Sequence, residues 1–142
     1  MTAEELFALP PDSTRVDKWL FSGRILERYN RNRFHSPGHS SAVTSMSTLL
    51  GMWSKIAGAG RFRAYGYGCP YLLGRGPDTV LSFDASLARQ PTVIRRDSVF
   101  VPGVPLLAVE VLELDEDQGL VDQLVQESLR LGVPAASSFP FR

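Results

Sequence analysis

The chain has 142 residues, and its 44% apolar and 21% charged content is that of a folded globular protein, which excludes disorder as its main state. Fifteen basic residues balance fifteen acidic ones, so no overall field attracts nucleic acid, and a DNA contact would need a local basic patch. A single cysteine excludes an internal disulfide and a structural zinc site built from thiolates.

The sequence also bears on the compartment. No run approaches the roughly 18 apolar residues of a membrane helix, and the first residues lack the basic and apolar regions of a secretory signal. We therefore expect a cytoplasmic protein without membrane contact, folded as a single domain over residues 1–142.

The first elements in chain order are a short helix and a hairpin. Thr2 and Glu5 have the spacing of a capping box, and the apolar residues that follow form a short helix before two prolines end it. Residues 16–26 predict two short strands around a Ser22-Gly23 turn. The basic stretch 27–36 is expected to be irregular.

A long amphipathic helix follows. Ser36 provides an N-cap and Pro37 suits the first helical position. Apolar residues then recur every three or four positions to about Ile56, where glycines end the pattern.

The middle of the chain is rich in aromatic residues and glycine. It predicts strands near 62–66, 71–73 and 79–85, with a tight turn over 74–78. This turn contains Gly-Arg-Gly but lacks the Lys-Ser/Thr and the helix of a phosphate-binding loop, so we interpret it as a hairpin turn. Residues 89–99 have no clear pattern.

The last third predicts a buried strand and a helix. Residues 104–112 form a near-continuous apolar run, typical of a strand covered on both faces. A helix is expected over 117–131, and the tail 135–142 is expected to fray. The predicted fold is α/β, with a central mixed sheet of five or six strands flanked by two helices.

Two carboxylates stand out from this pattern. Glu110 interrupts the apolar run, so it either faces a cleft or a cation, or simply faces solvent at the end of the strand. Asp84 shares one face of its predicted strand with Ser82 and Ser86. Carboxylates on neighbouring strands can hold a divalent cation such as Mg²⁺, and a metal held there can activate a water for attack on a phosphate.

Five segments in a fixed order resemble a known family: MTAEELFALP, WLFSGRIL, SPGHSSAV, GRGPDTVLSFDASLA, and VPLLAVEVL followed by SLRLGVP. Together they are similar to the Uma-type restriction endonucleases, a bacterial group of the PD-(D/E)XK nuclease superfamily. The resemblance implies a restriction-endonuclease-like fold and a hydrolase that cuts DNA phosphodiester bonds with Mg²⁺ or Mn²⁺. It implies that Asp84 and Glu110 are catalytic metal ligands and that the main-chain carbonyl of Val111 is a further ligand.

The sequence departs from the family in its proline-aspartate site, where Phe83 replaces the proline, and at two further positions. The family glutamate before the first hairpin turn corresponds to Trp19, or to Lys18 if the register slips by one. The neighbourhood of the family lysine holds Gln123 and Leu124, and no lysine follows Lys55. The alternative function is therefore a catalytically degenerate member that binds DNA or a protein partner.

Other candidate residues each have two interpretations. Arg28, Arg31 and Arg33, interleaved with aromatic residues, predict contacts to DNA phosphates and bases, or else a solvated loop. His39 matches a histidine often found at this family position. His39 or His35 would serve as a base; the alternative is a polar residue in the first turn of the helix. Cys69 lies in an aromatic strand and is interpreted as a packing residue.

The chain also looks shortened relative to the family, which continues after Gly-Val-Pro into an apolar strand. A frayed tail would leave the edge beside the Glu110 strand unpaired. We therefore expect a monomer of low stability that forms a homodimer or aggregates through this edge.

Overall fold

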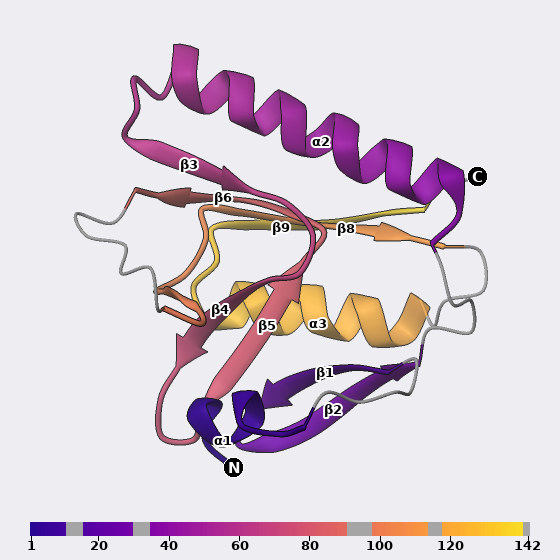
Figure 1. The fold of residues 1–142 in the computed structure, drawn as a ribbon, viewed down its shortest axis with the longest axis vertical. Helices are drawn as coiled ribbons and strands as arrows, with labels where there is room; N and C mark the ends of the chain where they lie inside the picture. Colours follow the sequence, from indigo (N-terminus) through magenta and orange to yellow (C-terminus); the bar gives the residue numbers. More distant parts are fainter. Residues whose placement is uncertain (11–15, 30–34, 91–97, 114–117, 141–142) are drawn as a thin grey trace.

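The computed structural model describes residues 1–10, 16–29, 35–90, 98–113 and 118–140. Within these ranges the strands form two sheets and the helices cover them, so the predicted α/β class is confirmed (Figure 1). The single sheet of five or six strands is replaced by one sheet of five strands and one of four.

The N-terminal elements follow local sequence signals. Helix α1 (Ala3–Phe7) has the predicted capping box: Thr2 Oγ1 accepts from the Glu5 amide, and Glu5 accepts from the Thr2 amide. Strands β1 (Val16–Phe21) and β2 (Arg24–Tyr29) form the predicted hairpin. Positive φ angles at Ser22 (46°) and Gly23 (77°) are those of a tight hairpin turn.

The five-stranded sheet has the order β2-β1-β5-β4-β7. It contains β4 (Cys69–Gly74), β5 (Thr79–Phe83) and the two-residue β7 (Val101–Pro102). Strands β4 and β5 pair antiparallel around the predicted 74–78 turn. Strand β2 extends three residues into the stretch expected to be irregular, because Glu27–Tyr29 pair with the first half of β1.

The four-stranded sheet has the order β3-β6-β8-β9. Its strands are β3 (Phe62–Tyr65), β6 (Ala85–Arg89), β8 (Leu107–Leu112) and β9 (Ala135–Pro140). Helix α2 (Pro37–Ile56) covers one face, and α3 (Gln118–Arg130) lies on the opposite face (Figure 1). This is a mixed sheet flanked by helices, as predicted, since β8 and β9 are parallel and the other pairs antiparallel.

The chain changes sheets at Asp84. Strand β5 ends at Phe83 in the five-stranded sheet, and β6 begins at Ala85 in the four-stranded sheet. The single strand predicted over 79–85 is therefore two strands, and Asp84 is the residue between them. Residues 91–97, which fall within the stretch without a clear pattern, lie outside the described residues.

The expectation of a frayed tail is wrong. Residues 135–140 form β9, which pairs in parallel with β8 from Leu107↔Ala135 to Leu112↔Pro140. Main-chain pairing supplies the order that the weak apolar pattern does not indicate, and α3 packs against β9 as well. The edge beside the Glu110 strand is thus paired, which removes the reason given for a homodimer; the homodimer itself stays a prediction.

Strand β8 separates two clusters of buried side chains. Val109 and Val111 pack toward α2, where Val43, Met46 and Leu50 contact them. Ala108 faces the other way, into a core that α3 and strands of both sheets share. Because side chains alternate along a strand, Glu110 lies on the Ala108 side, between the two sheets.

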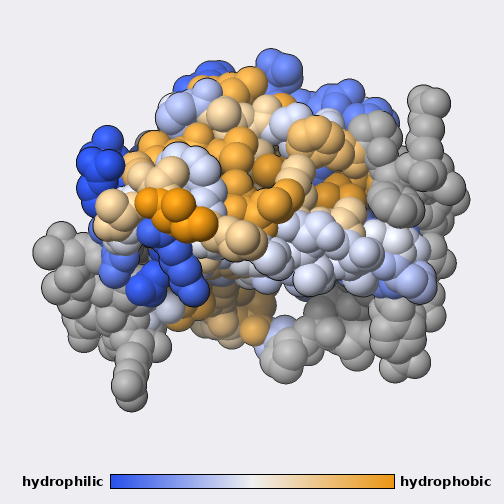
Figure 2. Space-filling view, turned by 90° about the horizontal axis from the view of Figure 1, so that it is seen from above, coloured by the Kyte–Doolittle hydropathy of each residue, from blue (hydrophilic) through white to orange (hydrophobic). Residues whose placement is uncertain are grey.

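The outer surface of α2 carries apolar side chains. Figure 2, which views the molecule from the α2 side, shows apolar residues over much of this face. The exposed ones on the helix are Leu49, Met52, Trp53 and Ile56. No helix among the described residues combines the length and the apolar character that a membrane span requires.

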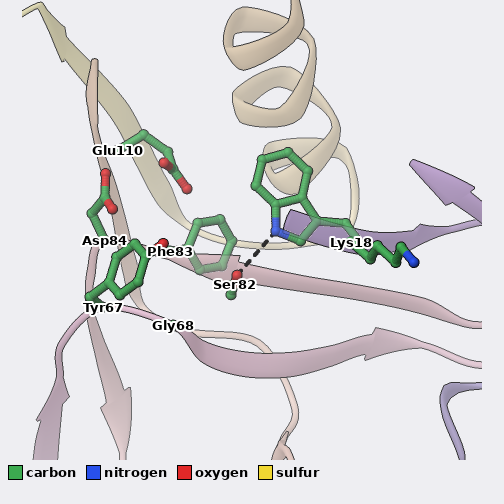
Figure 3. Close-up of a pocket in the computed structure, with 8 residues that line it drawn as sticks. Lys18, Tyr67, Gly68, Ser82, Phe83, Asp84 and Glu110 are labelled. Atoms are coloured by element: carbon green, nitrogen blue, oxygen red, sulfur yellow. Dashed lines mark hydrogen bonds between the residues drawn. The ribbon is translucent and has the colours of Figure 1, made fainter. Parts of the chain in front are cut away.

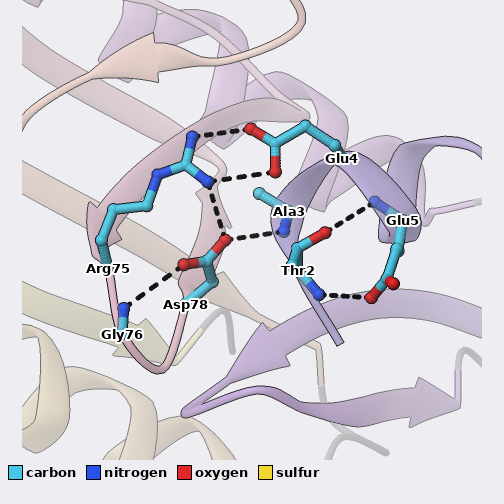
Figure 4. A network of polar contacts seen from close by, with 7 residues as sticks. All are labelled: Thr2, Ala3, Glu4, Glu5, Arg75, Gly76 and Asp78. Atoms are coloured by element: carbon cyan, nitrogen blue, oxygen red, sulfur yellow. Dashed lines mark hydrogen bonds and ion pairs between the residues drawn. The ribbon is translucent and has the colours of Figure 1, made fainter.

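An exposed arginine ties the N-terminus to the β4–β5 turn (Figure 4). Arg75 donates to both carboxylate oxygens of Glu4, at 2.7 and 3.0 Å, and to Asp78 Oδ2 at 2.9 Å. Asp78 also accepts from the Ala3 amide. The hydrogen bonds from Arg75 lower the pKa of Glu4 to about 2, and the Ala3 amide lowers the pKa of Asp78.

This network predicts a loss of stability in acid. A carboxyl group with a lowered pKa in the folded state stabilises the fold above its unfolded pKa, and this contribution disappears as the pH falls through the folded value. We expect Glu4→Gln to be less stable than wild type at pH 7, with the difference shrinking between about pH 4.5 and 2. Urea denaturation at pH 7 and pH 3 measures this; a difference independent of pH would contradict it, and 1 M salt should reduce it at pH 7.

Candidate active site

A cavity of about 160 Å³ opens where the two sheets meet. It is lined by Lys18 and Trp19 of β1, by Ser82 and Phe83 of β5, by Tyr67 and Gly68, and by Asp84 and Glu110. Figure 3 shows both carboxylates on the same side of this cavity. The two acidic residues singled out from the sequence, 26 positions apart, are therefore brought to one site.

Asp84 is held rigidly. It is only 2% exposed, and its Oδ2 accepts a 2.7 Å hydrogen bond from the amide of Val111 in β8. This bond links the junction between the sheets to the strand that carries Glu110. A buried carboxylate with a main-chain donor keeps a fixed position, which suits a metal ligand.

Glu110 is 3% exposed, so the alternative of a solvent-facing residue at the end of the strand is wrong. It lies within β8, opposite Ser138 of β9, and its side chain reaches the cavity. Two carboxylates in one small cavity repel each other when both are ionised, and a divalent cation bound by both would offset this repulsion.

Lys18 and Trp19 both line the cavity, so both alternatives for the position of the family glutamate reach the site. Trp19 Nε1 donates to Ser82 Oγ at 3.1 Å, and its ring is part of the core. In Figure 3 the ammonium end of Lys18 points away from the two carboxylates. Leu124, near the expected family lysine, is buried in the core, and Gln123 is exposed on α3.

His39 also reaches the site. It lies in the first turn of α2, is 2% exposed, and its Nε2 is 3.5 Å from Asp84 Oδ2. The ring of His35 stacks on it, with ring centroids 4.2 Å apart. The sequence indicated no partner for either histidine, and the structure gives His39 a carboxylate neighbour.

The other predicted residues are not among those that the structure shows lining the cavity. Arg28 is on β2, and Arg31 and Arg33 lie outside the described residues. Cys69 begins β4, and burial raises the pKa of its thiol, which agrees with a packing role. Tyr67, which sequence analysis missed, lines the cavity from an aromatic, glycine-rich stretch that gave no specific signal.

Comparisons with known proteins show a likeness of fold. No protein family matches the sequence, and no curated protein does so either. The structure is similar to a solved one, that of a proposed nuclease belonging to DUF820 from Anabaena variabilis. The match has a TM-score of 0.72 at 17% sequence identity and covers 99% of this chain and 74% of that chain. The chain has a nuclease-like α/β fold.

The DUF820 group is of the Uma type, so the resemblance inferred from the five sequence segments is supported as a likeness of fold. At this level of identity the similarity says how the chain folds.

Proposed function

We propose that this protein is a metal-dependent nuclease that hydrolyses DNA phosphodiester bonds. The observation that carries the proposal is the cavity between the two sheets, where buried Asp84 and Glu110 lie together. The nuclease-like fold supports the same reaction class. The proposal includes DNA as substrate, with Arg28, Arg31 and Arg33 as phosphate contacts, and a cytoplasmic location.

The residues fit a hard divalent cation. Carboxylate oxygens and main-chain carbonyls are the ligands that Mg²⁺ and Mn²⁺ prefer, and Asp84, Glu110 and the Val111 carbonyl would supply three of them. When bound, the cation would supply charge for the phosphate and an activated water.

The protein groups around these ligands have complementary roles. The Val111 amide fixes Asp84 through the 2.7 Å hydrogen bond, so the ligand geometry is set before substrate arrives. His39, 3.5 Å from Asp84 Oδ2, is near enough to accept a proton from an attacking water. An imidazole is suited to this proton transfer near neutral pH, whereas an arginine is not, because its guanidinium stays protonated.

A second candidate is a degenerate protein that binds DNA or another protein without cutting DNA. The observation that favours it is the position of the lysines. The sequence contains only Lys18 and Lys55, and the side chain of Lys18 points away from the carboxylates. If this second candidate is correct, the cavity still binds a cation because its carboxylates are intact, but the protein does not cut DNA.

Nicking of supercoiled plasmid tests the proposal. Wild-type protein should convert plasmid to open circles with Mg²⁺ or Mn²⁺ and should stop when EDTA is added. Glu110→Gln, which removes one ligand charge at nearly constant volume, should slow nicking by at least roughly 10²-fold. Glu4→Gln is the matched control, because it makes the same chemical change in a side chain that is 59% exposed at the surface.

Three results of this assay have distinct meanings. Loss of nicking in Glu110→Gln but not in Glu4→Gln supports the nuclease. Equal nicking by all three proteins indicates a contaminant and contradicts the proposal. No nicking by wild type, together with retained DNA binding, identifies the degenerate alternative.

A further inference from the structure

A second polar cluster lies beside the candidate active site. It consists of His35 before α2, His39 in the first turn of α2, and Glu113 directly after β8. One potential ligand atom from each of the three residues lies within 4.8 Å of the others. His35 Nδ1 and Glu113 Oε1 are 3.4 Å apart.

Two nitrogens of this cluster are buried without a hydrogen bond. Within the described part of the chain, His35 Nδ1 and His39 Nε2 have no hydrogen-bond partner. The side chain of His39 is 2% exposed, so bulk water does not compensate it. Nearly all buried polar atoms in folded proteins are satisfied, and a bound ion or water is a usual explanation for an exception.

The cluster is also held in place by the main chain around it. Glu113 Oε1 accepts a 2.7 Å hydrogen bond from the Ser36 amide, and Ser36 Oγ in turn accepts from the His39 amide. The end of β8 and the start of α2 are thereby joined. These bonds fix the Glu113 carboxylate beside the first turn of α2, the helix that carries His39.

We propose that His35, His39 and Glu113 form a binding site for a divalent transition metal ion of the zinc class. Two imidazoles and one carboxylate are a known ligand set for Zn²⁺, with a fourth position left for water. Ligands bound at about 2.1 Å with tetrahedral angles lie roughly 3.4 Å apart, which is the separation of His35 Nδ1 and Glu113 Oε1.

One ring turns when the ion binds. The two imidazole planes are nearly parallel, at 13°, and a ring nitrogen coordinates within its own plane, so the stacked rings cannot both point at one ion. His35 is the ring with room to move: its side chain is 22% exposed, and it lines a cavity of about 240 Å³ with His39 and Tyr67. Turning the ring would break the 3.2 Å contact between His35 Nε2 and the Tyr67 hydroxyl.

This site differs in chemistry from the one at Asp84 and Glu110. That cavity offers oxygen ligands, which favour Mg²⁺, whereas imidazole nitrogens favour Zn²⁺, Co²⁺ or Ni²⁺. The two sites adjoin through His39, whose Nε2 is 3.5 Å from Asp84 Oδ2, so His39 cannot accept a proton from the attacking water while it holds the ion. Zinc binding at the cluster does not depend on nuclease activity, so it is tested by direct binding.

The test is titration of the full chain with Zn²⁺ by calorimetry, with Co²⁺ as a spectroscopic probe of tetrahedral nitrogen and oxygen ligation. With excess Mg²⁺ present to fill the Asp84–Glu110 cavity, we expect one Zn²⁺ ion per chain. His35→Ala and Glu113→Gln should each weaken binding by at least roughly 10- to 100-fold. Glu110→Gln, the same chemical change in the neighbouring cavity, and Cys69→Ser should leave the affinity within about threefold. Circular dichroism establishes that each variant is folded.

Two outcomes would overturn the proposal. The first is the absence of saturable binding at one ion per chain. The second is an equal loss in Glu110→Gln and Glu113→Gln, which would place the ion at the Asp84–Glu110 cavity. Neither outcome depends on whether the protein nicks plasmid, so the zinc site and the nuclease can fail separately.

Discussion

Asp84→Asn should abolish metal-dependent nicking, with a loss of at least roughly 10²-fold. The substitution removes the charge that a divalent cation needs. It keeps an oxygen acceptor for the Val111 amide, whose hydrogen bond to Asp84 is 2.7 Å long. The fold should therefore persist while the proposed activity is lost. The nicking rate and a urea denaturation curve measure the two effects separately.

Asp84→Ala separates the role of Asp84 as a metal ligand from its role as acceptor for the Val111 amide. It also removes the acceptor and leaves the buried Val111 amide unsatisfied, which should cost an additional 1–3 kcal/mol or so of stability relative to Asp84→Asn. Nicking by Asp84→Asn at the wild-type rate would show that Asp84 is a structural residue at the sheet junction and not a metal ligand.

Deletion of residues 135–142 should abolish cooperative folding. Strand β9 pairs with β8 along six positions, from Leu107↔Ala135 to Leu112↔Pro140, and it packs against α3. At about 1 kcal/mol net for each lost hydrogen bond, the loss is comparable with the roughly 5–15 kcal/mol that stabilises a small domain. Thermal melting followed by circular dichroism measures it.

The truncation should also expose the edge of β8 and cause association that increases with concentration, visible by light scattering. Phe139→Ala is the control, because this side chain is 46% exposed and its removal leaves the main-chain pairing intact. It should shift the melting temperature little. A truncated chain that melts cooperatively near the wild-type temperature would show that β9 is dispensable.

Several elements could be predicted from the sequence because their causes are local. The Ser36 cap, Pro37 and the apolar spacing define α2 with its observed bounds. The Ser22-Gly23 turn forms its hairpin because Gly23 readily adopts the positive φ angle that the second turn position requires. The apolar run predicts that β8 is buried, and Glu110 stands out within it because a buried carboxylate needs a reason.

Other features depended on partners distant in the chain. Strand β9 has a weak apolar pattern, and pairing with β8 orders it. The division of residues 79–89 between two sheets at Asp84 leaves no local signal, because both halves are equally apolar and extended. Propensity for a strand depends on the neighbouring strands that the fold supplies, so periodicity did not reveal either feature.

The candidate site likewise combines features that the sequence indicates with features that depend on distant parts of the chain. The sequence by itself determined which residues are candidates for the chemistry: Asp84 and Glu110 as oxygen ligands, and His35 and His39 as bases. Only the tertiary structure decided which of them meet. The sheet change at Asp84 brings its carboxylate to the Val111 amide, and the start of α2 brings His39 within 3.5 Å of Asp84 and His35 within 3.4 Å of Glu113. Side chains 26 to 78 positions apart converge because main-chain pairing and helix packing act over the whole domain, and no local pattern in the chain records that convergence.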